Sequence, residues 1–387
     1  MNSEAHPPQV RSRLPEVGTT IFTVMSALAQ QHAAVNLGQG FPDFAGDPAL
    51  LDLVTDAMRA GHNQYPPMAG VPLLREAVSR KIVRQHGRRY DPDTEITITA
   101  GATQALLTAV LALVHPGDDV IVLDPCYDSY VPAIALAGAR AVRVPLRQDS
   151  FSPDFDAIRA AISARTRAII INTPHNPSGR VWSADERAEL ARLIAPTEIL
   201  VISDEVYEHM VFDGRAHASA SAWPELAARA VVVSSFGKTF HVTGWKVGYV
   251  VAPAALTTEF RKVHQFNVFT VNTPMQHALA HYLAEPTHYE GLSAFYQRKR
   301  DLFRNGLASS RFELLPCEGS YFQCVDFSAV SDLDDEAFCR WLTQHVGVAA
   351  IPLSPFCATA PQRRIARFCF AKQDATLERA LERLAGL

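Results

Sequence analysis

The chain has 387 residues and a formal net charge of −4, from 36 basic and 40 acidic residues, and 48% of its residues are hydrophobic. This near balance of charge gives no reason to expect nucleic acid or an anionic membrane as a partner. The length suits about two domains with a large buried core.

The cysteines and the first residues bear on where the protein works. The six cysteines show neither a C-x-x-C pair nor metal-ligand spacing with histidine, so we expect no metal site. Scattered thiols fit a reduced, cytoplasmic protein better than a disulfide framework. The polar start MNSEAHPPQVRSR lacks the apolar run of a secretory signal, and no apolar stretch is long enough for a membrane span. We expect the first dozen residues to form a loose arm.

Short apolar runs alternate with helix-length segments through the first two thirds of the chain. Helices are predicted over 103–114 and 184–194. Runs that are apolar on both faces indicate buried strands, and this alternation indicates βα units around a mostly parallel sheet. The seven predicted strands are 96–99, 119–124, 139–144, 167–172, 199–203, 230–235 and 247–252.

The last third of the chain has a different pattern. A long helical segment, 288–307, precedes strand-like stretches at 320–327 and 364–371, with a less regular alternation. We therefore predict an α/β fold in two parts: a large domain over 48–285, with a seven-stranded sheet flanked by helices, and a smaller α+β domain over 286–387. Residues 1–47 are expected to form an N-terminal arm and part of the smaller domain.

Small residues follow the first strand of the sheet. Gly101, Ala102 and Thr103 lead into a helix that we expect to begin at about Thr103. The free N–H groups and positive dipole end of a helix N-terminus suit a phosphate, although an ordinary helix cap is the better explanation of these three residues taken alone. In open α/β sheets ligands bind beyond the carboxyl ends of the strands, so the residues after each later strand matter too.

Chemically useful side chains follow four of those strands. Tyr127 can stack on a flat ring, Asn176 can donate and accept hydrogen bonds, and Asp204 supplies a carboxylate with Tyr207 three residues on. Lys238 follows the strand AVVVSS; a desolvated lysine has a lowered pKa and can form a Schiff base. Taken singly, each is better explained as a core tyrosine, a turn, a helix cap or a surface lysine. Together they match the needs of a phosphorylated pyridine cofactor.

Three segments carry a family resemblance: NTPHNPSG, SDEVYE and SSFGKTFHVTGWKVGY. They resemble the signatures of fold-type I, class I/II aminotransferases that use pyridoxal 5′-phosphate. The likeness extends from LGQGFPDF to RIARFCFAK; the methionine aminotransferases are the most similar group, followed by kynurenine aminotransferase/glutamine transaminase.

The resemblance implies a role for each cofactor-side residue. Lys238 would attach the cofactor covalently and move the proton, Asp204 would pair with the pyridine nitrogen, and Tyr127 would stack on the ring. Tyr207 and Asn176 would hydrogen-bond the phenolic oxygen. The phosphate would be held by Ala102, Thr103, Ser235 and Lys246, with Gly101 shaping the turn, and many relatives have an arginine in place of Lys246.

The resemblance also implies how the substrate binds. Arg367 in RIARFCFAK would hold the substrate carboxylate beside Gly40 and Asn176, and Phe22 would line the side-chain pocket. Tyr65 would reach the cofactor phosphate of the neighbouring subunit, so the expected unit is a homodimer with shared sites. VFTVNTP lacks the arginine that aspartate-selective relatives place there, which favours methionine or another large apolar or aromatic amino acid.

Two other functions remain as alternatives. Kynurenine/glutamine-type transamination, or a β-lyase that acts on cysteine S-conjugates, uses the same fold, although such lyases often have histidine in place of Tyr207. A cofactor-sensing regulator would need a DNA-binding module, for which the chain has neither spare length nor a basic patch.

Overall fold

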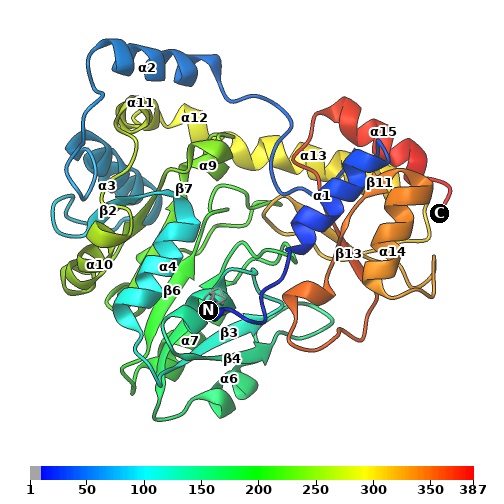
Figure 1. Cartoon of the computed structure of the whole chain (residues 1–387), viewed down its shortest axis with the longest axis horizontal. Helices are drawn as coiled ribbons and strands as arrows, with labels where there is room; N and C mark the ends of the chain where they lie inside the picture. Colours follow the sequence, from blue (N-terminus) through cyan, green and yellow to red (C-terminus); the bar gives the residue numbers. More distant parts are fainter. Residues whose placement is uncertain (1–9) are drawn as a thin grey trace, which may run out of the picture.

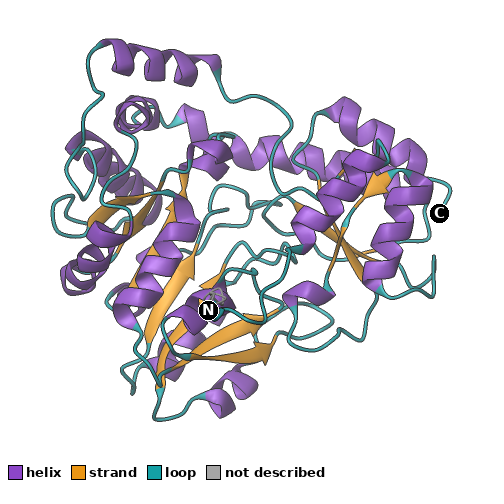
Figure 2. Ribbon diagram, in the orientation of Figure 1, coloured by secondary structure: helices purple, strands orange, loops and turns teal. Residues whose placement is uncertain are grey.

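The computed structural model describes residues 10–387, and the first nine residues of the predicted arm lie outside it. Its centre is a seven-stranded sheet in the order β2-β8-β7-β6-β5-β3-β4 (Figures 1 and 2). All pairings are parallel except those of β8, which runs antiparallel to both of its neighbours. The strands are β2 (Ile96–Thr99), β3 (Asp119–Asp124), β4 (Arg140–Pro145), β5 (Thr166–Asn172), β6 (Leu200–Asp204), β7 (Ala230–Ser235) and β8 (Gly248–Val251).

Helices cover both faces of this sheet, which confirms the predicted α/β architecture. Alternate residues of a strand point to opposite faces, so Val120 and Val122 of β3 pack in one apolar cluster while Ile121 and Leu123 pack in the other. The first cluster is completed by α4 (Gly101–Leu113), α5 (Tyr130–Leu136) and α10 (Ala254–Asn267). The second includes residues of α3 (Pro72–His86), α6 (Phe155–Ala161), α7 (Ala184–Ile194), α8 (Pro224–Ala227) and α11 (Thr273–Leu283), the last of which also packs against α2 (Pro48–Arg59).

Local sequence signals explain several helix ends. At the start of α7, Ser183 Oγ accepts a bond from the Glu186 N–H at 3.1 Å, and the Glu186 carboxylate accepts one from the Ser183 N–H at 2.7 Å. This capping box satisfies two N–H groups of the first turn. The predicted helix 288–307 is interrupted at Gly291, which separates α12 (Thr287–Glu290) from α13 (Leu292–Leu307).

A second, smaller α+β layer follows the central sheet, as predicted. Its antiparallel sheet has the order β12 (Ile351–Pro352), β13 (Ile365–Cys369), β10 (Phe322–Asp326) and β9 (Glu313–Leu314). The strand β1 (Val35–Asn36) pairs in parallel with β11 (Val348–Ala349), so a segment from the first tenth of the chain joins this part. Helices α1 (Ile21–Gln31), α14 (Asp335–Trp341) and α15 (Asp374–Leu384) also belong to it, on the right of Figure 1. Among residues 10–387, no helix combines the length and apolarity needed to cross a membrane.

Candidate active site

The strand register brings the polar strand ends together at one edge of the central sheet. Asn172, the last residue of β5, pairs with Asp204, the last residue of β6, and Ser235 at the end of β7 pairs with Gly248 at the start of β8. Gly248 also pairs with Thr99 at the end of β2. Because β8 is antiparallel, its beginning meets the ends of its neighbours, and the segment that precedes it reaches the same edge.

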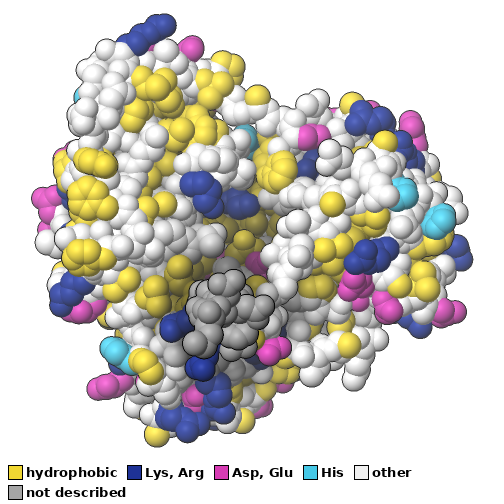
Figure 3. Space-filling view, viewed as in Figure 1, with side chains coloured by type: hydrophobic (Ala, Val, Ile, Leu, Met, Phe, Trp, Pro, Cys, Tyr) yellow, Lys and Arg dark blue, Asp and Glu magenta, His cyan; other side chains and the backbone are white. Residues whose placement is uncertain are grey.

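A cavity of about 240 Å³ opens at this edge, in the hollow between the two parts of the molecule (Figure 3). The structure brings thirteen of the fourteen predicted site residues into its wall and leaves Tyr65 outside. Those in the wall are Phe22, Gly40, Gly101, Ala102, Thr103, Tyr127, Asn176, Asp204, Tyr207, Ser235, Lys238, Lys246 and Arg367.

Asp204 is a buried carboxylate that is held from two sides. Its Oδ2 accepts a 2.6 Å bond from the Tyr130 hydroxyl, and its Oδ1 accepts a 3.3 Å bond from the Val206 N–H. Burial raises the pKa of Asp204 to about 6, and the bonds from Tyr130 and Val206 counteract only part of that rise. A carboxylate in this setting is poised to pair with a cation that enters the cavity.

Tyr207 lies between two anchored glutamates. The Glu205 carboxylate bonds His217 and the Ala220 N–H, both at 2.8 Å. Glu208 pairs with Lys81 at 2.8 Å. These buried contacts fix the turn after β6, because an unpaired charge there would be costly. Burial raises the pKa of Tyr207 well above its usual value, so its hydroxyl keeps its proton.

Lys238 points its amine into the cavity. Nζ donates to the Tyr321 hydroxyl at 2.8 Å and to the Gly40 carbonyl at 3.2 Å. Burial lowers the pKa of Lys238 to about 8; nearby Asp204 opposes this shift, whereas Lys246 and Arg367 add to it. A lysine with a lowered pKa is neutral more often near pH 7 than an ordinary lysine, and a neutral amine can act as a nucleophile or a base.

The N-terminus of α4 and Lys246 form an anion-binding corner. The helix begins at Gly101, two residues earlier than predicted, and this first residue has a φ of +77°, which glycine adopts readily. An added Cβ at Gly101 would lie 3.4 Å from both Cε and Nζ of Lys246. No side chain caps the helix start and no acidic residue occupies its first turn. The first N–H groups of the helix and a nearby ammonium group are therefore available to an anion.

Arg367 is buried in the wall of the same cavity. It donates to Asn176 Oδ1 at 2.7 Å and to the Gly38 carbonyl at 3.1 Å, while its Nε has no partner in the described structure. Its guanidinium carbon lies 3.9 Å from the ring centre of Phe322 and 5.3 Å from that of Phe22. Burial lowers the pKa of Arg367, which nevertheless stays charged and can bind a carboxylate.

Sequence reasoning missed three residues of this region. Tyr130 follows the same strand as Tyr127, and its hydroxyl holds Asp204. Tyr321 holds Lys238, and Lys372 binds the carbonyls of Gln39 and Phe41 beside Gly40. Tyr321 and Lys372 belong to the predicted strand-like stretches SYFQCVDF and RIARFCFAK. No local sequence pattern shows which end of such a strand faces the cavity.

The sequence pattern that describes aminotransferase class I and II matches residues 33–384. The chain belongs to this family. Its relatives include the methionine aminotransferase of Escherichia coli, which is 57% identical over 378 residues, with 97% of this chain and 98% of that protein covered. A probable N-succinyldiaminopimelate aminotransferase of Mycobacterium tuberculosis is 43% identical over 388 residues, with 97% and 98% covered.

Solved structures agree with the aminotransferase fold. An Escherichia coli structure for which a methionine aminotransferase function was identified superimposes with a TM-score of 0.97 at 56% identity, covering 98% of this chain and all of that one. As an aminotransferase, the enzyme moves an amino group from an amino acid to a 2-oxo acid.

Proposed function

We propose that this aminotransferase uses pyridoxal 5′-phosphate, attached through Lys238, and takes its amino group from methionine or another large apolar or aromatic amino acid. The observation that carries the proposal is one cavity that joins a buried carboxylate, a lysine of lowered pKa, an anion-binding corner and a buried arginine. Kynurenine/glutamine-type transamination and β-elimination from cysteine S-conjugates remain the alternatives.

The residues present fit this cofactor. Asp204 offers a carboxylate to the pyridine nitrogen, and the α4 N-terminus with Ser235 and Lys246 offers a corner for the phosphate. Tyr127 supplies a ring to stack on, while Tyr207 and Asn176 offer hydrogen bonds to the phenolic oxygen. When bound, the cofactor supplies an electron sink that stabilises negative charge at the substrate Cα.

The chain's own residues then bind the substrate and move its proton. Arg367 grips the substrate carboxylate with its planar fork, and Gly40 and Asn176 complete that contact. Lys238 Nζ would take the proton from the substrate Cα and would deliver a proton to C4′ of the bound cofactor. The cycle is ping-pong: the first 2-oxo acid leaves before the second substrate binds the same residues.

The preference for an apolar side chain rests on the rings in the cavity wall. Phe22, Phe41, Phe322 and Tyr127 line it, and Phe356 packs edge-on against Phe22 with ring centres 5.8 Å apart. Sulfur packs favourably against aromatic rings, which suits methionine. Within the described residues, the cations of the wall are those assigned to the cofactor and the substrate carboxylate, so a second substrate carboxylate finds no partner in this chain.

We further propose a homodimer in which Tyr65 completes the partner's site. Tyr65 is 82% exposed and stacks edge-on against Phe269, with ring centres 5.5 Å apart. Leu51 and Met58 of α2 are also exposed. Figure 3 shows hydrophobic side chains gathered over α2 and α11, and an apolar surface of this kind favours association with another protein. We place the dimer in the cytoplasm, because all six cysteines are free thiols.

A panel of amino donors against one 2-oxo acid tests the preference. Methionine is expected to give the fastest formation of its keto acid, followed by phenylalanine, tyrosine and kynurenine. Assays for ammonia and thiol with a cysteine S-conjugate separate transamination from β-elimination. Lys238→Ala should remove both the visible absorbance of the lysine-bound cofactor and nearly all turnover; either one at the unsubstituted level would contradict the assignment of Lys238.

A further inference from the structure

Tyr321 contacts the group that carries the proton, although nothing in the predicted mechanism uses it. Its hydroxyl accepts the 2.8 Å bond from Lys238 Nζ and donates in turn to the Gly40 carbonyl. The same carbonyl accepts the second bond from Nζ, at 3.2 Å. Lysine, tyrosine and backbone thus form a closed set of three hydrogen bonds.

In this arrangement each of the two hydrogens of a neutral Lys238 amine has its own acceptor. One N–H points to the tyrosine oxygen and the other to the Gly40 carbonyl, so the nitrogen lone pair is the remaining position. A base must present its lone pair to the proton that it removes, and the orientation of that lone pair decides how fast the transfer is. Tyr321 therefore orients the base as well as contacting it.

The tyrosine itself has little freedom to move. It is fully buried, and its ring lies 5.0 Å from that of Tyr207 and 4.8 Å from that of Phe322, both edge-on. Burial raises the pKa of Tyr321 well above its usual value, so the hydroxyl remains a donor to Gly40 at every working pH.

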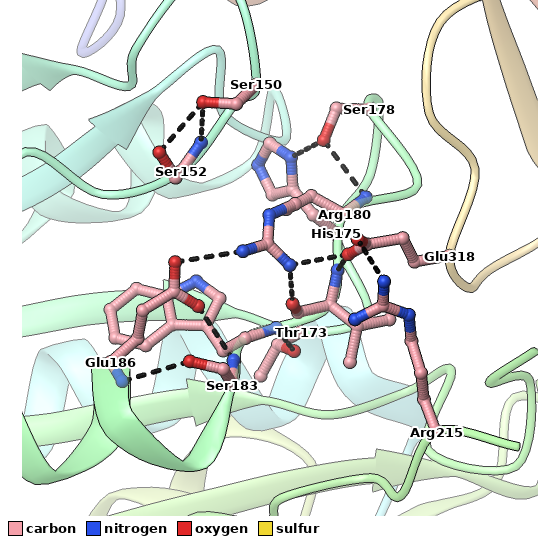
Figure 4. Close-up of polar contacts among 12 residues, drawn as sticks. Ser150, Ser152, Thr173, His175, Ser178, Arg180, Ser183, Glu186, Arg215 and Glu318 are labelled. Carbon is pink, nitrogen blue, oxygen red and sulfur yellow. Dashed lines mark hydrogen bonds and ion pairs between the residues drawn. The ribbon is translucent and has the colours of Figure 1, made fainter.

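A charged cluster fixes the turn that precedes Tyr321 (Figure 4). The Glu318 carboxylate accepts bonds from Arg180 and from the Val181 N–H, the latter at 3.1 Å, and pairs with Arg215 at 3.1 Å. Arg180 also pairs with Glu186 at 2.9 Å. The cluster ties the turn to the loop that carries Asn176, as Figure 4 shows for the neighbouring residues of that loop.

The next residue of the turn is held through the backbone. The Gly319 N–H donates to the Gly179 carbonyl at 2.9 Å, and an added Cβ at Gly319 would come within 2.6 Å of the Met210 carbonyl. Only glycine fits there, and the backbone of the turn is packed directly against that of Met210. The position of the Tyr321 hydroxyl is consequently fixed by the contacts of the preceding turn and by the packing of its own ring.

We propose that Tyr321 is a catalytic residue of the transamination, because its hydroxyl holds Lys238 Nζ with the lone pair free whenever the lysine is not joined to the cofactor. The inference rests on the proposed function. Glu318 is its positioning residue, which acts through the turn 318–321.

The test compares Tyr321→Phe with Tyr296→Phe. The control removes another buried hydroxyl, which bonds His241 at 3.0 Å and belongs to a ring 5.9 Å from that of Tyr321. In single-turnover conversion of methionine, Tyr321→Phe should slow the reaction about 10- to 100-fold and enlarge the isotope effect of deuterium at Cα, since proton transfer becomes more limiting. Tyr296→Phe should keep the rate and isotope effect of the unsubstituted enzyme.

A second readout needs no cofactor. Competitive acetylation of the cofactor-free protein, read by peptide mass spectrometry across pH, reports the pKa of Lys238. Tyr321→Phe removes an acceptor of the charged amine and should lower this pKa by about half a unit or more, whereas Tyr296→Phe should leave it unchanged. An unchanged pKa together with an unchanged isotope effect in Tyr321→Phe would overturn the inference.

The outcomes separate this inference from the proposed function. If borohydride fails to trap the cofactor on Lys238 of the unsubstituted enzyme, the proposed function fails and the catalytic role of Tyr321 fails with it. If trapping succeeds but the tyrosine comparison shows no difference, only the role of Tyr321 is wrong. Should Tyr321→Phe not fold, Glu318→Gln replaces it: an enlarged isotope effect supports the role, and an unchanged one contradicts it.

Discussion

The buried carboxylate of Asp204 reduces the free energy of unfolding of the protein at neutral pH. Its carboxylate is 4% exposed, and burial raises its pKa from 3.8 to about 6. The folded protein therefore binds a proton at Asp204 more tightly than the unfolded chain does. Between these two pKa values stability falls as the pH rises, and above about pH 6 the loss is complete, at roughly 3 kcal/mol.

Asp204→Asn should consequently stabilise the cofactor-free protein at pH 7.5 by up to roughly 3 kcal/mol and have little effect near pH 4. The amide keeps an acceptor for Tyr130 but carries no charge. Urea unfolding at both pH values measures the difference, with the exposed Asp52→Asn on α2 as the control. A variant that is less stable than the parent at pH 7.5 would contradict this account of the burial.

Arg367 and Arg363 lie four residues apart but have different surroundings. Arg363 bridges Asp326 and Glu313, each at 2.8 Å, at the outer end of the strand. Arg367 is buried in the cavity wall and retains an unpaired Nε. The second arrangement leaves hydrogen-bonding capacity for a substrate.

Arg367→Lys keeps a cation but loses the planar fork, so KM for the amino acid should rise about 10- to 100-fold while the absorbance of the bound cofactor persists. Arg363→Ala serves as the control and should leave KM within about twofold. Steady-state kinetics with methionine, together with the cofactor spectrum, measures both. Loss of cofactor from Arg367→Lys would mean that the arginine has another role.

At the scale of elements, the anion-binding corner depends on the backbone where β2 turns into α4. Gly101 has a φ of +77°. Gly87, at the end of α3, has a similar φ of +70° and is therefore a matched control. An added Cβ at Gly87 meets nothing within 4 Å, whereas one at Gly101 faces Lys246. The two glycines share a left-handed backbone conformation, but only Gly101 lies at the site.

Gly101→Ala and Gly87→Ala should each destabilise the fold by about 1–2 kcal/mol, the cost of a left-handed alanine. Only Gly101→Ala should also weaken cofactor binding, by about tenfold or more, because the helix start and Lys246 shift away from the phosphate. Equilibrium binding followed by absorbance, beside thermal unfolding of both variants, gives the comparison. Equal cofactor affinity in the two variants would remove α4 from the phosphate site.

At the scale of the whole molecule, Tyr65 and Lys238 of one chain lie apart: Lys238 lines the cavity, while Tyr65 stands exposed beside Phe269. A shared-site dimer predicts that Tyr65→Ala and Lys238→Ala damage different sites of a mixed dimer. In the hybrid dimer, one site contains both substituted residues, and the other site contains an unsubstituted Lys238 and an unsubstituted Tyr65.

Mixing these two inactive or weakened variants after reversible unfolding should restore about a quarter of the full activity, since half of the dimers are hybrids with one intact site of two. Asp204→Asn mixed with Lys238→Ala is the control. Each site takes both Asp204 and Lys238 from a single chain. Every site of the hybrid therefore carries one of the two substitutions, and no activity returns. Recovery in the control, or none in the first mixture, would refute the sharing of sites through Tyr65.

Prediction from the sequence was most successful where the pattern is local. The seven strands of the central sheet occur where the apolar runs predicted them, to within a residue or two. Strands such as β3, which are buried on both faces, must be largely apolar, whereas the edge strand β4 is mostly only partly buried. The helix over 288–307 was predicted as one segment and is two, since the break at Gly291 depends on how its two parts pack.

By itself the sequence determined the fold class, the order of the strands along the chain and the residues that follow them, since periodicity and side-chain chemistry act locally. Only the tertiary structure decided that β8 runs antiparallel, that Lys246 therefore reaches Gly101, and that Tyr321, 83 residues after Lys238, holds its amine. Such contacts join residues distant in sequence, and their geometry follows from strand register and packing, which no single segment specifies.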